Sequence, residues 1–182
     1  MNFYISDTHF GHANVLGYDN RPFFSVEEME EEMVRRWNSV VGKGDVVYIL
    51  GDFCWQGDAE WVRILDRLNG NKVLIVGNHD VRGSAKLRAK FQDIKDYKEI
   101  NDAGRKVILC HYPVMCFKNH FHGAFHLYGH VHNSFEWNLV EHQKRMMTDL
   151  YERQYQMYNV GCMLPYMDYT PRTLDEIIEG AK

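Results

Sequence analysis

Histidines, aspartates and an asparagine recur in short clusters that suit the binding of divalent metal ions. The chain contains ten histidines, and six of them lie between positions 111 and 132. Imidazole nitrogens and carboxylate or amide oxygens are the usual protein ligands of Mn, Fe, Co, Ni and Zn. The clusters are Asp7-Thr8-His9, Gly51-Asp52, Gly77-Asn78-His79-Asp80, His111 and Gly129-His130-Val131-His132. A solvated loop needs no such concentration of histidine, so the sequence predicts a metal site.

The number of candidate ligands exceeds what one tetrahedral ion requires. The candidates are Asp7, His9, Asp52, Asn78, His111, His130 and His132. They suit two ions that share a carboxylate, for which Asp52 offers two oxygens. Two ions roughly 3.5–4 Å apart polarise phosphate oxygens and generate hydroxide from a shared water near neutral pH. Phosphoester hydrolysis is the predicted chemistry, with Asp52 and His79 as catalytic residues and His79 as the general acid.

Short apolar runs precede each cluster and predict the elements that position it. Runs of β-branched and large apolar residues are typical of strands buried on both faces. They cover residues 3–5, 46–50, 73–76, 107–110 and 124–128. In α/β sheets, groups beyond the carboxyl ends of strands meet in one crevice. In an extended backbone, Asp7 and His9 would point to the same side, and His130 and His132 repeat that spacing.

Helical patterns lie between the predicted strands. Ser25 with Glu28 forms a capping-box pattern before one helix, and a second helix begins near Asp58 and ends at Asn69-Gly70. A last strand is expected over 156–160, and Thr173 with Glu176 predicts a terminal helix over 174–179. Residues 140–155 suit a helix, a long hairpin or a mobile excursion. The alternation of strands and helices predicts one layered α/β domain over 1–182.

Composition and charge exclude several classes of protein. The net charge of −4 is unlike that of proteins that bind long nucleic acids, which usually carry basic surfaces. No apolar run approaches the ~20 residues of a membrane span, and the N-terminus lacks the pattern of a signal peptide. The four cysteines form no CxxC pair and are expected to be reduced thiols. We therefore expect a cytoplasmic protein with no membrane partner, while the oligomeric state is open.

Taken together, DxH, GD, GNHD, His111 and GHxH resemble the calcineurin-like metallophosphoesterase superfamily in order and approximate spacing. The resemblance implies a four-layer α/β sandwich of two mixed β-sheets flanked by helices. It also implies two ligand sets that share Asp52. They are Asp7, His9, Asp52 and His132 for the first ion, and Asp52, Asn78, His111 and His130 for the second. Asn78 and His79 would also meet the substrate phosphate. Mn, Fe, Zn, Ni and Co all suit these ligands, and we favour Mn.

The sequence departs from that superfamily at one place. Many members follow the Gly-Asp pair with an Asp-Arg pair, whose aspartate orients the acid histidine. Here Gly51-Asp52 continues as Phe53-Cys54-Trp55-Gln56. The difference argues against a resemblance to Ser/Thr protein phosphatases and leaves the partner of His79 open, although Asp80 is adjacent.

Several further residues have both a functional and a structural interpretation. His12 could contact substrate, or it could be an ordinary loop histidine. Arg21 could clamp a phosphate through its two-pronged guanidinium, or it could form a salt bridge at a helix entry. Phe53 and Trp55 could wall a ring-binding pocket, but core packing is the favoured interpretation. Lys118 and His122 are expected to be surface residues, and His120, His126 and His142 receive no functional role.

The sequence therefore predicts a metal-dependent phosphoesterase that hydrolyses phosphomonoesters or phosphodiesters through a hydroxide bridging two metal ions. The substrate would be a small phosphate ester, with nucleotides included. One alternative is a binding or scaffold module that keeps the fold without catalysis. Another is a nuclease acting on short or cyclic nucleotides.

Overall fold

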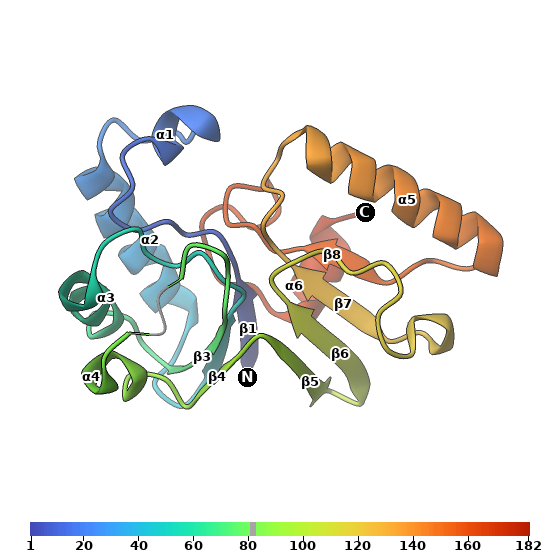
Figure 1. Ribbon diagram of the computed structural model, residues 1–182, viewed down its shortest axis with the longest axis horizontal. Helices are drawn as coiled ribbons and strands as arrows, with labels where there is room; N and C mark the ends of the chain where they lie inside the picture. Colours follow the sequence, from blue (N-terminus) through green and yellow to red (C-terminus); the bar gives the residue numbers. More distant parts are fainter. Residues whose placement is uncertain (81–82) are drawn as a thin grey trace.

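Two four-stranded sheets form the centre of the protein (Figure 1). The computed structural model describes residues 1–80 and 83–182. The first sheet contains β1 (Asn2–Ile5), β2 (Val46–Ile49), β3 (Asn71–Ile75) and β4 (Asp93–Lys95), in that order and all parallel. The second contains β5 (Tyr97–Asp102), β6 (Arg105–Cys110), β7 (Phe125–Tyr128) and β8 (Met157–Asn159) in that order. Strand β5 is antiparallel to β6, whereas β6, β7 and β8 are parallel.

Successive side chains of the second sheet pack into two different cores, as strand geometry requires. Val107 and Leu109 of β6 join the main core, which also contains the first sheet. Ile108 and, on β7, Tyr128 join a second cluster together with Val140 of helix α5 (Phe135–Tyr151). This alternation places one face of the sheet toward the first sheet and the other beneath α5.

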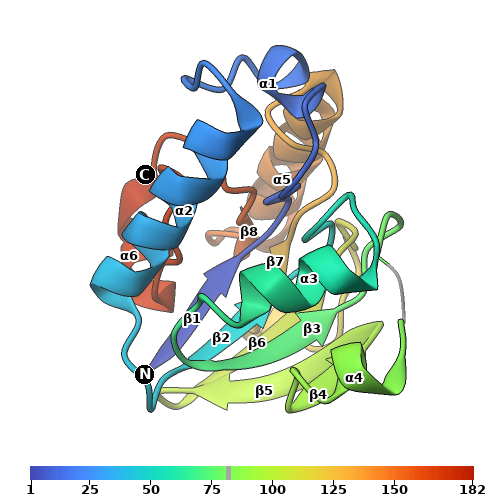
Figure 2. The same ribbon diagram turned by 90° about the vertical axis from the view of Figure 1, so that its left-hand side faces the viewer.

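Helices cover the outer faces of the two sheets, as the views in Figures 1 and 2 show. On the side of the first sheet lie α2 (Val26–Val40), α3 (Asp58–Leu65) and the short α4 (Ala85–Arg88). Trp37 of α2 and Trp61 of α3 are almost completely buried, and burial of one such side chain stabilises the fold by roughly 1.5–3 kcal/mol. The remaining helices are α1 (Val15–Tyr18), the 3-10 turn η1 (His120–His122) and α6 (Leu174–Gly180).

Backbone bonds beyond β1 join the two sheets near the ends of their strands. The Ser6 N–H donates to the Val160 carbonyl at 2.9 Å, and the Cys162 N–H donates to the Ser6 carbonyl at 2.9 Å. These bonds bring the segment after β1 beside the segment after β8. The carboxyl ends of the parallel strands in both sheets therefore face a common region.

The predicted fold class is confirmed, with mixed pairing found in the second sheet only. Residues 140–155 belong mainly to α5, which begins earlier than expected because Ser134 accepts a capping bond from the Glu136 N–H. The helix from Asp58 ends at Leu65, earlier than predicted, and Leu68 is nevertheless buried. Strands β4 and β5 were not predicted, because they are short or alternate exposed and half-buried residues without a continuous apolar run.

Within the described ranges 1–80 and 83–182, no helix combines the length and the apolar character needed to cross a lipid bilayer. All four cysteines are free thiols, as expected.

Candidate metal centre

The structure brings the seven predicted ligands together beyond the carboxyl ends of five parallel strands. In chain order they are Asp7 and His9 after β1, Asp52 after β2, Asn78 after β3, His111 after β6, and His130 and His132 after β7. Because the two sheets are bridged beyond β1, side chains that are distant in sequence share one site.

Five of these residues have a left-handed backbone. Their φ angles are 55° at Asp7, 50° at His9, 51° at Asp52, 71° at His130 and 49° at His132. This conformation costs a residue other than glycine roughly 1–2 kcal/mol, although Asp and His tolerate it better than most. Such conformations concentrate at functional sites, where the surrounding structure enforces them. The expected extended spacing at DxH and HxH is therefore wrong, because local left-handed turns position these side chains.

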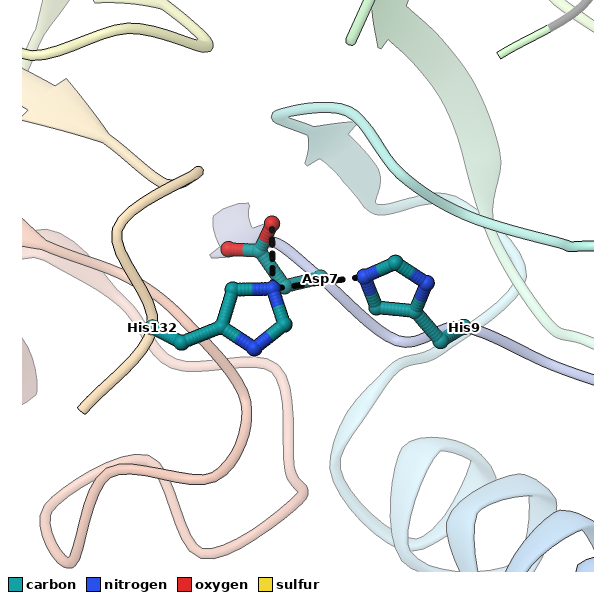
Figure 3. A group of neighbouring side chains, drawn as sticks. All are labelled: Asp7, His9 and His132. Atoms are coloured by element: carbon teal, nitrogen blue, oxygen red, sulfur yellow. Dashed lines mark hydrogen bonds and ion pairs between the residues drawn. The ribbon is translucent and has the colours of Figure 1, made fainter. Parts of the chain in front are cut away.

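The first group of ligands consists of Asp7, His9 and His132 (Figure 3). The candidate ligand atoms of the three side chains all lie within 4.8 Å of one another. His132 Nε2 lies 3.6 Å from Asp7 Oδ1 and 3.3 Å from His9 Nε2. Asp7 is completely buried and His9 nearly so, which excludes a simple surface cluster.

A second group lies directly beside the first and shares Asp7 with it. Ligand atoms of Asp7, Asp52 and His111 all lie within 4.8 Å of one another. Asn78 Oδ1 lies 3.0 Å from His111 Nε2 and 2.9 Å from His130 Nδ1, which places both histidines around one amide oxygen.

The carboxylate of Asp52 lies between the two groups. Its Oδ2 is 3.8 Å from His9 Nε2 and 3.6 Å from His111 Nε2. These distances are too long for hydrogen bonds. They are less than twice a metal–ligand distance of about 2.0–2.2 Å, so one cation can contact both atoms of each pair. The arrangement of donors therefore fits two neighbouring divalent ions.

Hydrogen bonds at the far side of two imidazoles fix which nitrogen faces the site. His111 Nδ1 lies 2.7 Å from the Leu50 carbonyl, and His132 Nδ1 lies 2.7 Å from Asp19 Oδ1. Both partners are acceptors, so each proton resides on Nδ1 and the Nε2 lone pair is directed at the ligand group. Such outer partners orient metal-binding histidines and increase their basicity. Sequence reasoning missed Asp19, which lies in the loop between DxH and the first long helix.

Asp19 is also the partner of Arg21, and this pair agrees with the salt-bridge interpretation of Arg21. Arg21 is buried, and its Nε and Nη2 donate to Asp19 Oδ2 at 3.0 and 2.8 Å. Its guanidinium also donates to the carbonyls of Thr8 and Asp7, both at 2.8 Å. All these acceptors belong to the protein, so Arg21 stabilises the ligand loop, and its contact with substrate stays a prediction.

Charges around Asp19 set its ionisation and that of His132. Burial opposes ionisation of Asp19, but the hydrogen bond to His132 and the charge of Arg21 outweigh it and lower the pKa of Asp19. Burial also opposes protonation of His132, yet the bond to Asp19 and the charge of Asp7 raise its pKa.

Burial makes isolated charge costly inside the ligand groups. It raises the pKa of the Asp7 carboxyl and lowers the pKa of the His9 imidazole to about 2. A neutral imidazole is the form that binds a metal, and a divalent cation stabilises the ionised carboxylate. The electrostatics of the site therefore also fit bound cations.

Glycines before two ligands allow their loops to approach closely. A Cβ on Gly129 would lie 1.9 Å from Ser6 Oγ and 2.5 Å from Asp7 Oδ2. A Cβ on Gly51, where φ is +88°, would lie 2.3 Å from His111 Nδ1. The Gly-Asp and Gly-His pairs thus have a steric cause, since any side chain at the first position displaces a ligand.

An open cleft of about 200 Å³ lies over the ligand groups. Its described lining consists of His9, His12, Val15, Tyr18, Asp52, Trp55, Asn78, His79, His130 and His132. His12 lies in the cleft, as one of its two interpretations required. Trp55 corrects the preference for core packing because it is 45% exposed, whereas Phe53 is buried as expected. Tyr112 was missed: it is 43% exposed, and its ring lies 4.8 Å from that of His130.

The acid candidate His79 lies at the cleft, but Asp80 does not orient it. Asp80 accepts backbone N–H bonds from Gly77 at 2.8 Å, Asp52 at 3.0 Å and Phe53 at 2.9 Å. Its carboxylate therefore ties the loop after β2 to the loop after β3. Burial raises the pKa of Asp80 to about 6.

The other histidines and Lys118 have structural explanations or lie at the surface. His126 belongs to β7 and is fully buried, and its Nδ1 donates to the Ile108 carbonyl at 3.1 Å. Lys118 forms a surface pair with Glu99, and His122 and His142 are exposed. None of these residues lines the cleft.

Comparison with known proteins agrees with this geometry. The model of the calcineurin-like phosphoesterase family matches residues 3–156. The uncharacterized protein MJ1445 of Methanocaldococcus jannaschii is 34% identical over 178 residues, which cover 96% of this chain and 88% of that protein. The gene 66 protein of Mycobacterium phage L5 is 38% identical over 80 residues, or 42% of this chain and 38% of the phage protein.

A solved structure has a similar fold over almost the whole chain. The crystal structure of AQ665 from Aquifex aeolicus, a protein of unknown function, superposes with a TM-score of 0.72 and 27% identity, covering 98% of both chains. The present chain belongs to the calcineurin-like phosphoesterase family, on a match that includes all seven candidate ligands.

Proposed function

We propose that this member of the calcineurin-like phosphoesterase family hydrolyses small phosphate esters at a two-metal centre and prefers diesters to monoesters. The observation that carries the proposal is the pair of adjacent ligand groups, with Asp7 common to both and Asp52 between them. A single structural ion would need neither a shared carboxylate nor a cleft above it.

The two ions would have separate sets of ligands except for Asp52, which would contact both. Asp7, His9, Asp52 and His132 would hold one, and Asp52, Asn78, His111 and His130 the other. When bound, such ions polarise phosphate oxygens and lower the pKa of a coordinated water toward neutrality. Mn²⁺ is the favoured occupant because mixed oxygen and imidazole ligands accept it, although Fe, Zn, Ni and Co suit the same donors.

The protein's own groups would position the ester and complete the proton transfer. Asn78 is exposed at the cleft, where its amide would meet the phosphate oxygens of a bound ester. His79 is also exposed there, and its backbone N–H donates to Asp52 Oδ1 at 2.9 Å. Its imidazole would give a proton to the leaving oxygen, a service that contributes about 10²–10⁴ to rate in comparable enzymes.

The charge of the cleft favours diesters. A monoester carries close to two negative charges near neutral pH, because its second pKa is about 6, whereas a diester carries one. Among the described lining residues there is no lysine or arginine, and Arg21 is turned toward Asp19. Among the residues that the structure describes, the second charge of a monoester would therefore meet no cationic side chain in the cleft. Short or cyclic nucleotides are diesters that an open cleft would accept.

A metal-reconstitution assay tests the proposal. Metal-stripped protein is loaded with Mn²⁺ and assayed on a chromogenic diester and a chromogenic monoester, beside Asp52→Asn and the surface control Asp66→Asn. We expect turnover that requires metal, is higher on the diester, fails in Asp52→Asn and persists in Asp66→Asn. Two bound ions without turnover on either ester would instead favour the scaffold alternative, and higher turnover on the monoester would refute the charge argument.

A further inference from the structure

Among the residues that the structure describes, His79 has no carboxylate or carbonyl partner for its ring. Its imidazole contacts other rings: that of Trp55 at 4.5 Å between centroids with 51° between planes, and that of His9 at 6.0 Å. The nearest carboxylate in sequence, Asp80, is occupied by three backbone N–H groups. The indole of Trp55 is therefore the closest described ring that could hold His79 in place.

Trp55 is itself held firmly. Its backbone N–H donates to the Phe10 carbonyl at 2.9 Å, and the neighbouring Gln56 side chain donates to the Gly11 carbonyl at 2.8 Å. His12 stacks on the indole with ring centroids 3.9 Å apart and planes within 7°. His12, Trp55 and His79 thus form a consecutive series of ring contacts along the cleft.

A large indole at this exposed position has no explanation in core packing. Trp55 is 45% exposed, whereas Trp37 and Trp61 are almost completely buried. Exposed aromatic rings lose hydrophobic stabilisation unless they serve a contact. Among the described residues, the rings beside Trp55 are those of His12, His79 and, at 6.0 Å, His9.

We infer that Trp55 is the positioning residue of His79, and that a tilted ring contact takes the place of the carboxylate that would otherwise orient the acid. This inference rests on the proposed function. An exposed histidine without a partner samples several staggered rotamers. Packing against a fixed indole restricts those rotamers and keeps the imidazole beside the leaving oxygen. Misplacing a reacting group by about 1 Å can cost 10²-fold in rate, so the contact has a measurable consequence.

The kinetic test compares two methyl phosphodiesters that have the same ring and different leaving groups, phenyl and 4-nitrophenyl. The more basic phenolate needs a proton from the acid, whereas 4-nitrophenolate leaves without one. We expect Trp55→Ala to lower kcat about 10- to 100-fold on the phenyl ester and to have little effect on the 4-nitrophenyl ester. Trp55→Phe keeps a ring beside His79 and should restore most of the rate.

A double-variant comparison shows whether the two residues act as one unit. We expect His79→Ala to lower kcat on the phenyl ester at least as much as Trp55→Ala. Adding Trp55→Ala to His79→Ala should cause no further loss, because the positioned group is then absent. Phe24→Ala, at a fully exposed phenylalanine away from the cleft lining, is the control for loss of a surface ring.

The contact also has a readout that does not require turnover. In metal-free protein, the indole should shift the His79 ring protons upfield in NMR spectra, and Trp55→Ala should abolish the shift. Wild-type protein without this shift would overturn the inference. So would equal losses of kcat on both esters, or additive losses in the double variant.

Two other outcomes separate the hypotheses. A rise in KM on both ring-bearing esters with unchanged kcat would make Trp55 a binding surface for the substrate ring and overturn the positioning role. A wild type that hydrolyses neither ester with metal bound would overturn the proposed function and this inference with it. An active wild type with the wrong leaving-group pattern would overturn this inference alone.

Discussion

Replacing Asp19 by asparagine should weaken metal binding although Asp19 is not a ligand. Asp19 Oδ1 lies 2.7 Å from His132 Nδ1, and its Oδ2 accepts two bonds from the buried Arg21 guanidinium. Asparagine has similar size but offers one acceptor oxygen and no charge. It can therefore satisfy either His132 or Arg21, but not both.

The size of the effect follows from both interactions. Loss of an outer partner of a metal-binding histidine typically lowers metal affinity about 10- to 100-fold. At a free Mn²⁺ concentration of 100 times the wild-type Kd, binding at one site stabilises the fold by about 2.7 kcal/mol. The same relation gives about 1.4 kcal/mol for tenfold weaker binding and about 0.4 kcal/mol for hundredfold weaker binding. Separately, Arg21 loses its counter-charge, which should lower the metal-free free energy of unfolding by about 3 kcal/mol.

Urea unfolding with and without Mn²⁺ separates the two effects. The metal-free curves measure the loss at Arg21, and the stability gained on adding Mn²⁺ measures binding at His132. Asp66→Asn, which alters an exposed aspartate paired with Lys90, should match wild type in both measurements. A stability gain from Mn²⁺ that is the same in Asp19→Asn as in wild type would refute the role assigned to Asp19.

Two further predictions concern groups whose roles differ from a first interpretation of the sequence. Burial lowers the pKa of His126 to about 4, below its ordinary value of 6.5, so the neutral form stabilises the fold above pH 6.5 and this stability is lost as pH falls toward 4. This residue should lower the free energy of unfolding of the wild type by about 2 kcal/mol between pH 7 and 5. Urea unfolding should show a smaller pH-dependent loss for His126→Gln. It should show the same loss as wild type for the exposed His142→Gln. Arg21→Lys keeps the charge but loses the guanidinium fork, so it should lower the free energy of unfolding by about 1–3 kcal/mol and leave KM for a diester unchanged. A raised KM with an unchanged free energy of unfolding would show that Arg21 binds the substrate phosphate.

The sequence carried most of the information on the fold and on the ligand clusters. Apolar runs identify buried strands, and the ligands follow the runs directly, so their convergence needs only the geometry of parallel sheets. The first residues of two helices could also be predicted from the sequence, because the side chains of Ser25 and Thr173 both accept the expected capping bonds. Strand β5 was not, because its half-buried edge position leaves the alternation without a strong apolar signal.

The outer contacts of the site could not be predicted from spacing. Asp19 is an ordinary loop aspartate in the sequence, and its meeting with His132 depends on how two distant loops pack. Trp55 was expected in the core and lies at the cleft, whereas Arg21 had two open interpretations and is found in a buried pair with Asp19. Both side chains are large enough to lie in the core or at the cleft, and contacts with residues from other segments of the chain determine where each one lies.

The left-handed backbone at five ligands explains why so many protein groups hydrogen-bond to the loops that carry them. Five left-handed residues at roughly 1–2 kcal/mol each amount to about 5–10 kcal/mol of unfavourable conformation. Arg21 donates to the carbonyls of Asp7 and Thr8, and the Asp80 carboxylate accepts from three backbone N–H groups. The Asp7 N–H also donates to the Gly51 carbonyl, and the His9 N–H donates to the Asp52 carbonyl, both at 3.0 Å. None of these bonds involves a metal. These bonds between protein groups offset part of the cost of the left-handed turns. A fold that depends on its metal, such as a zinc finger, has few such bonds to hold its ligands.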